Sequence, residues 1–67
     1  WQQQATGANV LAAMGALAAT AGNHSEAVTH YSASLALKPA VLIRVRLARS
    51  FLALGHPNSA LVHLLAL

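Results

Sequence analysis

The chain lacks cysteine entirely, and it carries one acidic residue and three aromatic residues among its 67. Without cysteine there is neither a disulfide framework nor a thiolate metal site. A single carboxylate, on Glu26, cannot supply a two-carboxylate acid–base site or a Ser–His–Asp arrangement. The four glycines are spread singly, so no glycine-rich phosphate loop is present. We therefore expect a protein without catalytic residues, and not an enzyme.

Long apolar runs are also missing. A membrane-spanning helix needs about 20 consecutive apolar residues, whereas the run from Val10 to Ala21 is about a dozen long. The later run over 41–54 contains Arg44, Arg46 and Arg49, each of which costs about 2.5–3.5 kcal/mol at the bilayer centre. Intrinsic disorder is excluded as well, because 57% of residues are hydrophobic and only 7% are charged. We expect a folded chain that does not span a membrane.

Four histidines and a net charge of +3 raise the questions of metal and nucleic-acid binding. His24 and His30 are six residues apart and face different ways on a helix, while His56 and His63 are seven apart, or about 10 Å along it. Zinc-binding helices place two histidines four residues apart. The pI of about 10.9 reflects the scarcity of acids, and four basic groups make a weak phosphate footprint. We expect no metal, no cofactor and no nucleic-acid partner.

Turn-forming residues divide the chain into four segments of similar length. The turns are Gly22-Asn23, Lys38-Pro39 and Gly55-His56-Pro57. The segments between them are rich in alanine and leucine, which favour helix, and none alternates as a strand would. After a lead-in segment over 1–7, we predict helices over about 8–21, 23–37, 40–54 and 57–67.

Capping residues support these boundaries. Asn23 followed three residues later by Glu26 is a capping-box pattern, and Thr6 is a candidate N-cap for the first helix. Gly22 and Gly55 suit the left-handed conformation that closes a helix. The loops are short, so consecutive helices are expected to pack antiparallel.

The two halves of the chain resemble each other when shifted by 33 residues. A helical hairpin that recurs at such a period is typical of an α-solenoid. The residues that the shift aligns are Met14 with Leu47, Gly15 with Ala48, Gly22 with Gly55, Ala27 with Ala60, His30 with His63, Tyr31 with Leu64 and Ala33 with Ala66.

One pattern spans the first unit: Leu11-x-x-Met14-Gly15-x-x-Ala18, followed by Gly22, Ala27, Tyr31, Leu35 and Pro39. It resembles the tetratricopeptide repeat (TPR) family, with one full unit over 8–40 and an incomplete second unit over 41–67. The pattern departs from the family at Ala18, where an aromatic is usual, at Ser34, where alanine is preferred, and at Arg44, where a large apolar residue is usual. The resemblance implies an all-α fold of four helices, in antiparallel hairpins stacked as a right-handed α-solenoid.

Small residues in this pattern have a direct physical reading. Gly15 and Ala27 allow the two helices of a hairpin to approach closely. We expect the larger apolar side chains around that contact to fill the space beside it, and these are Leu11, Met14, Tyr31 and Leu35.

The resemblance also implies a site. In the TPR family the first helix of each unit lines a concave groove, which places Arg46 and Arg49 there, together with Asn9 on the first unit. Similar basic residues in some members hold an acidic peptide or a C-terminal carboxylate, and guanidinium groups suit such recognition. The alternative is that these arginines merely solubilise an apolar helix. The remaining residues on the corresponding face of the first unit are small: Ala12, Ala13, Ala16 and Ala19.

The segment Ala60–Leu67 is apolar on nearly every face, and such a helix is normally buried. We expect further repeats or a partner chain to cover it, the 67-residue chain alone to associate, and the sequence to be a piece of a longer protein. The expected function is a protein–protein interaction or scaffold module that binds a partner peptide or helix in its groove. The alternative is an internal structural segment of a larger multi-repeat assembly, without a peptide ligand of its own. The cytosol and the periplasm both fit a chain without cysteine, and the cytosol is favoured.

Overall fold

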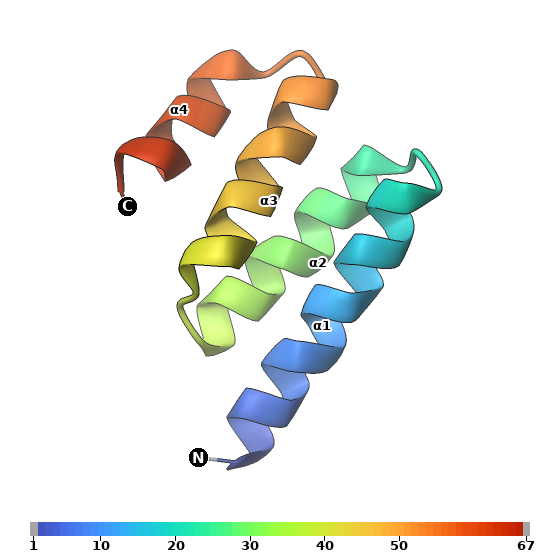
Figure 1. Cartoon of the computed structure of the whole chain (residues 1–67), viewed down its shortest axis with the longest axis vertical. Helices are drawn as coiled ribbons and strands as arrows, with labels where there is room; N and C mark the ends of the chain where they lie inside the picture. Colours follow the sequence, from blue (N-terminus) through green and yellow to red (C-terminus); the bar gives the residue numbers. More distant parts are fainter. Residues whose placement is uncertain (1, 67) are drawn as a thin grey trace.

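The computed structural model describes residues 2–66, with side chains from residue 6 onward. Within this range the chain forms four α-helices and no strand: α1 (Gln2–Thr20), α2 (His24–Leu37), α3 (Val41–Ala53) and α4 (Pro57–Leu65). The helices follow one another in sequence order, and each packs against the one before it (Figure 1). The prediction of an all-α chain with four helices is therefore confirmed.

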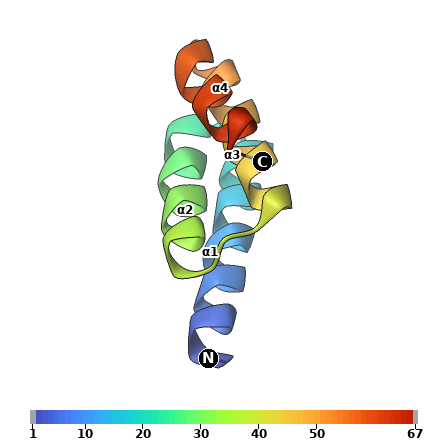
Figure 2. The same cartoon turned by 90° about the vertical axis from the view of Figure 1, so that its left-hand side faces the viewer.

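The molecule is thin in one direction. Its Cα atoms extend over 34 × 27 × 14 Å, and the side view shows how little depth the four helices occupy (Figure 2). A body this flat leaves much of each helix on the surface. No helix within residues 2–66 is long and apolar enough to cross a lipid bilayer.

The first helix begins earlier than predicted. It starts at Gln2 instead of near Ala8, so Thr6 lies inside α1 and does not cap it. Glutamine and alanine are good helix formers, and one glycine inside a helix costs only about 1 kcal/mol relative to alanine. Gly7 also lies close to α2, because a Cβ atom built there would be 3.4 Å from Leu37 Cδ1. Most of the predicted lead-in segment is therefore helical, while Trp1 lies outside the described residues.

The turn between α1 and α2 ends α1 with a pair of backbone hydrogen bonds. The N–H of Asn23 donates to the carbonyl of Ala18 at 2.8 Å, and the N–H of Gly22 donates to Ala19 at 3.0 Å. Gly22 has φ +83°, the left-handed conformation that this Schellman turn requires.

The turn between α3 and α4 repeats this geometry 33 residues later. The N–H of His56 donates to Phe51 at 2.9 Å, and the N–H of Gly55 donates to Leu52 at 3.0 Å. Gly55 has φ +80°. The two turns thus share their hydrogen-bond pattern and their glycine conformation.

The predicted cap at Asn23 is confirmed, with a change in its second hydrogen bond. The Asn23 Oδ1 accepts from the Glu26 N–H at 3.4 Å, and the Asn23 Nδ2 donates to Glu26 Oε2 at 2.6 Å. In a capping box the glutamate accepts from the backbone N–H of the cap residue. Here that N–H is already bonded to Ala18, so the side-chain amide takes its place.

Both turn glycines are expected to matter equally for stability. We expect Gly22→Ala and Gly55→Ala each to lower the free energy of unfolding by about 1–2 kcal/mol, the cost of a left-handed backbone for an L-residue. A Cβ atom at either position has no neighbour within 4 Å, so no steric clash adds to this cost. Urea denaturation followed by circular dichroism measures the change.

Asparagine is the matched control at both positions, because it tolerates the left-handed conformation better than alanine. Gly22→Asn and Gly55→Asn should lose less stability than the alanine variants. Equal losses for asparagine and alanine would show that the backbone conformation is not what these glycines supply.

The hydrophobic core lies between α2 and α3. Ala27 and Tyr31 of α2 pack with Ile43 and Leu47 of α3 in one cluster of buried residues. Partly buried residues from the first three helices and from the residue before α3 surround this cluster: Ala12, Ala18, Ala19, Val28, Leu35, Ala40 and Phe51.

Close approach of α1 and α2 depends on Gly15. A Cβ atom built there would lie 2.7 Å from Tyr31 Cδ1, so Tyr31 occupies the space that a side chain would need. This fits the predicted role of a small residue at position 15. The neighbouring prediction for Met14 is wrong, because its side chain is 42% exposed. Adjacent helical residues point about 100° apart, so Met14 does not face Tyr31 when Gly15 does.

A buried polar contact also joins α1 to α2. The hydroxyl of Ser34, which is 2% exposed, donates to the backbone carbonyl of Ala8 at 2.8 Å. A buried hydroxyl needs such a partner, and an alanine at position 34 could not make this bond. The contact gives a structural reason for the serine at a position where the TPR pattern favours alanine.

Candidate functional site

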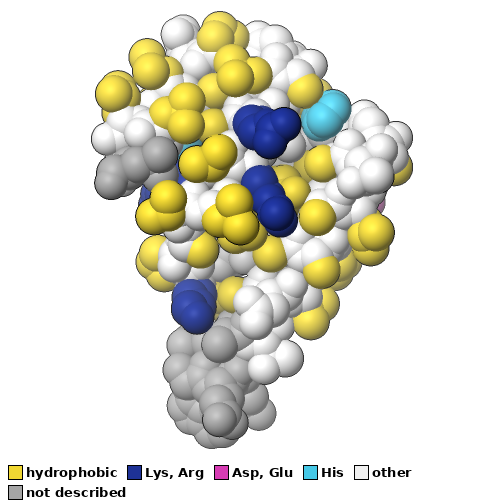
Figure 3. Space-filling view, viewed as in Figure 1, with side chains coloured by type: hydrophobic (Ala, Val, Ile, Leu, Met, Phe, Trp, Pro, Cys, Tyr) yellow, Lys and Arg dark blue, Asp and Glu magenta, His cyan; other side chains and the backbone are white. Residues whose placement is uncertain are grey.

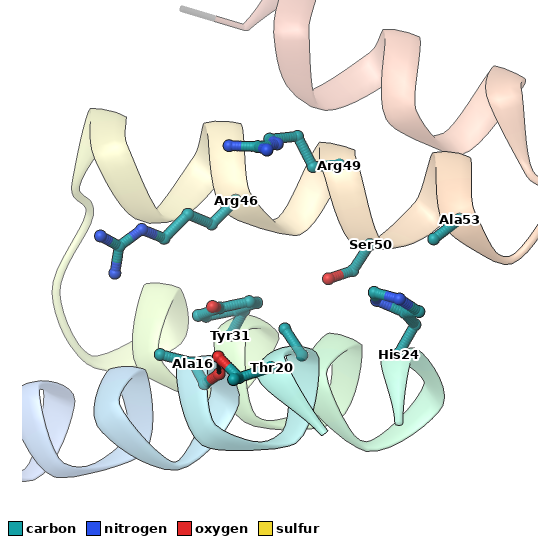
Figure 4. Close-up of a pocket in the computed structure, with 9 residues that line it drawn as sticks. Ala16, Thr20, His24, Tyr31, Arg46, Arg49, Ser50 and Ala53 are labelled. Atoms are coloured by element: carbon teal, nitrogen blue, oxygen red, sulfur yellow. Dashed lines mark hydrogen bonds between the residues drawn. The ribbon is translucent and has the colours of Figure 1, made fainter. Parts of the chain in front are cut away.

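A groove of about 520 Å³ lies between α3 and the hairpin formed by α1 and α2. Three helices contribute to it, so it exists only because α3 packs against α2 beside the first hairpin. Its lining residues are Ala16, Ala19, Thr20, His24, Tyr31, Arg46, Arg49, Ser50 and Ala53 (Figure 4).

The α3 side of the groove carries its positive charge. Arg46, Arg49 and Ser50 share one face of α3, because residues three and four apart are neighbours on a helix. Both arginines are exposed, whereas Ser50 is 3% exposed and points toward the first hairpin (Figure 4).

No carboxylate lies among the residues that line the groove. The only acidic side chain of the sequence is Glu26, and its Oε2 accepts from Asn23 at the start of α2. Around the groove, basic side chains are surrounded by hydrophobic and uncharged atoms (Figure 3). Within residues 2–66 the one carboxylate is therefore bonded elsewhere, and both guanidinium groups can bind an external anion.

The opposite side of the groove is largely apolar. The Tyr31 side chain is 2% exposed, and Ala16 and Ala19 form a smooth wall on α1. Thr20 adds little polarity, because its hydroxyl donates to the carbonyl of Ala16 at 2.9 Å within the same helix. This side suits an apolar part of a ligand.

His24 adds one unsatisfied polar atom. The residue lines the groove, but its Nδ1 is buried and has no hydrogen-bond partner among the described residues. An unpaired buried polar atom costs about 1–3 kcal/mol.

The structure brings together two of the three predicted site residues. Arg46 and Arg49 line the groove, whereas Asn9 is exposed on α1 and does not line it. Asn9 precedes Ala16 by seven residues, which is two helical turns or about 10 Å along α1. The structure therefore does not bring Asn9 together with the two arginines in this groove.

Arg44 belongs to a different contact. Its Nη1 lies 3.5 Å from Nδ1 of His63 on α4. The His63 ring stacks on Phe51, with ring centroids 5.7 Å apart and an interplanar angle of 10°. Arg44 thus helps to pack α4 against α3, and the groove keeps only two of the three arginines of α3.

Three polar groove residues were not predicted: Thr20, His24 and Ser50. Ser50 follows Arg46 by four residues, so helical periodicity alone places it on the same face. His24 has no such signal in the sequence, because its position at the groove depends on how α3 packs against α2. Within the described residues, no group of three or more histidine, cysteine or acidic side chains is placed to hold a metal ion.

No protein-family model, curated protein or solved structure matches this chain significantly. The resemblance to tetratricopeptide repeats therefore stays a prediction that depends on the residues quoted above.

Proposed function

We propose that this chain is a non-catalytic protein–protein interaction module that binds an acidic peptide segment or a C-terminal carboxylate of a partner. The binding site in this proposal is the groove between α3 and the α1–α2 hairpin. The observation that carries it is the pair Arg46 and Arg49 at the edge of a groove without a carboxylate among its lining residues.

The chemistry of the groove matches such a ligand. A guanidinium group binds a carboxylate through two parallel hydrogen bonds, which gives both energy and orientation. The small side chains of Ala16 and Ala19 on the opposite wall provide apolar contact area for the rest of the peptide. The net charge of +3 favours the approach of an acidic partner.

We further propose that the helices are two tetratricopeptide-like units, over 8–40 and 41–67, arranged as a short right-handed solenoid. Two kinds of agreement at a spacing of 33 residues support this. The turns at Gly22 and Gly55 have the same backbone geometry. Ala27 and Ala60 are buried to the same degree, with 0% and 1% of their surface exposed.

The groove proposal predicts a specific loss of binding. With a fluorescent peptide of alternating glutamate and leucine as probe, Arg46→Ala together with Arg49→Ala should raise Kd at least tenfold. Each lost hydrogen bond to a charged group is worth about 1.5–3 kcal/mol, and tenfold in Kd corresponds to about 1.4 kcal/mol. Fluorescence anisotropy measures the binding, and the C-terminal amide of the probe tests the role of a free carboxylate.

Lys38→Ala is the matched control for charge, because Lys38 is exposed at the end of α2 and does not line the groove. It should change Kd less than either single arginine substitution. Equal losses for all three single substitutions would mean that net charge alone attracts the probe, and the proposed site would be rejected.

A second function is favoured by a different observation. Leu61, Val62 and Leu65 of α4 are 52%, 66% and 78% exposed, which is a large apolar area for a single short helix. In this alternative the chain is an internal structural segment of a larger multi-repeat assembly. Further repeats or a partner chain would cover 60–67, and the groove would have no peptide ligand. A failure of every acidic probe to bind, together with association through α4, would favour this role.

A further inference from the structure

Two apolar faces lie on the first and the last helix of the row. On α1, Val10, Met14 and Leu17 are 53%, 42% and 72% exposed, and their spacing places them on one side of the helix. On α4, Leu61 and Leu64 are 52% and 39% exposed. We name these the α1 face and the α4 face. Several hydrophobic side chains also gather on the surface where α4 lies (Figure 3).

The α1 face has a buried counterpart inside the molecule. The residues 33 positions later are Ile43, Leu47 and Ser50, which are 9%, 0% and 3% exposed. Ile43 and Leu47 pack against α2 in the core cluster. The α1 face therefore occupies the positions through which α3 meets the helix before it.

The α4 face has a counterpart as well. The residues 33 positions before Leu61 and Leu64 are Val28 and Tyr31 of α2. Tyr31 is 2% exposed within the cluster that contains Ile43 and Leu47, and Val28 packs against that cluster. The α4 face therefore occupies the positions through which α2 receives the next helix.

From these equivalences we infer that two copies of the chain associate head to tail, with the α4 face of one copy packed on the α1 face of the next. This contact repeats the α2–α3 interface and is continuous with it, because each copy adds its helices to the same row. Neither face includes a charged residue, so no like-charge repulsion opposes the contact. The two faces differ from each other, so the association is heterologous and continues beyond a dimer unless a ring closes. The inference does not depend on the groove, whose α1 wall consists of Ala16, Ala19 and Thr20.

Two double variants test this inference by sedimentation velocity over a series of concentrations. The first changes the α1 face with Met14→Glu and Leu17→Glu, and the second changes the α4 face with Leu61→Glu and Leu64→Glu. The unchanged chain should increase in mass with concentration without stopping at a dimer, and the apparent association constant of each variant alone should fall at least tenfold. An equimolar mixture should restore a 1:1 dimer, because the first variant keeps its α4 face and the second keeps its α1 face.

The control is Leu42→Glu with Leu52→Glu, which adds the same charge at exposed positions of α3 outside both faces. It should associate like the unchanged chain. Far-UV circular dichroism checks that each variant keeps its helices. If a variant loses its helices, glutamine is introduced at the same positions instead of glutamate. A monomer at all concentrations would overturn the inference. So would variants that fail to complement each other, or an α1-face variant that still associates as the unchanged chain does.

Discussion

Replacing Leu47 with alanine should lower the free energy of unfolding by about 2–5 kcal/mol, the range measured for leucine-to-alanine changes in protein cores. Leu47 is 0% exposed and lies in the cluster that joins α2 to α3. The stability of a chain of 67 residues is about 3–10 kcal/mol at 0.05–0.15 kcal/mol per residue. This one substitution therefore removes a large part of the total, and at the upper end it unfolds the chain.

Leu52→Ala is the matched control, since Leu52 lies five residues later in the same helix and is 53% exposed. Its effect should stay within about 0.5 kcal/mol, as for surface substitutions in general. Urea denaturation followed by circular dichroism compares the two variants at a protein concentration where association is minimal. Similar losses at both positions would mean that the α2–α3 cluster is not the main core.

The number of helices and three of the four helix starts could be predicted because their signals are local. Gly22 and Gly55 adopt the left-handed conformation expected of them, and Asn23 caps α2 as its sequence pattern predicts. The start of α1 has no such local signal, so the predicted start near Ala8 is six residues too late. Residues 2–7 contain no strong stop signal, so a cap at Thr6 was a weak basis for a boundary.

Burial depended on neighbours that a local pattern does not specify. Met14 and Leu47 occupy equivalent positions in the two halves, yet Met14 is 42% exposed and Leu47 is 0% exposed. The difference arises because α3 follows another helix and packs against it, whereas α1 is the first helix of the row. An apolar residue at a repeated position therefore predicts which face of a helix packs against a neighbour. It does not predict whether that neighbouring helix belongs to this chain.

The residues of the candidate site also differ in whether local sequence or long-range packing determines their position. Arg46 and Arg49 were placed together by their spacing on one helix, and the structure keeps them together in the groove. The places of Asn9 and His24 depend on how α3 packs beside the first hairpin, which is a long-range feature that local spacing does not specify. The groove is lined on α1 by the last two turns of the helix, from Ala16 to Thr20, so it includes His24 at the start of α2 and leaves Asn9 outside.

Gly15→Ala should destabilise the chain although alanine is the better helix former. The added Cβ atom would lie 2.7 Å from Tyr31 Cδ1 and 2.8 Å from Tyr31 Cε1, well inside normal contact distance. Tyr31 is 2% exposed, so its ring has little room to move and α1 must shift away from α2. We expect this overpacking to cost about 1–3 kcal/mol of unfolding free energy. The gain in helix propensity is about 1 kcal/mol, so the net effect is a loss over all but the lower end of the overpacking range.

Gly7→Ala separates the two contributions, because it makes the same chemical change in the same helix. Its Cβ atom would meet only Leu37 Cδ1, at 3.4 Å, and this is the end of a flexible side chain. We expect unchanged or increased stability there, by up to about 1 kcal/mol from helix propensity. A loss at Gly7 as large as the loss at Gly15 would contradict the steric explanation.

A double-mutant cycle with Tyr31→Leu tests the contact itself. The second half of the chain carries Ala48 at the position of Gly15 and Leu64 at the position of Tyr31. There, alanine replaces glycine where leucine replaces the larger tyrosine. Gly15→Ala should therefore cost less when Tyr31 is already leucine, with a coupling energy of about 0.5–3 kcal/mol, as for residues in contact. Denaturation of the four proteins of the cycle gives this coupling directly. If the two changes add within about 0.5 kcal/mol, the tyrosine ring is not what requires glycine at position 15.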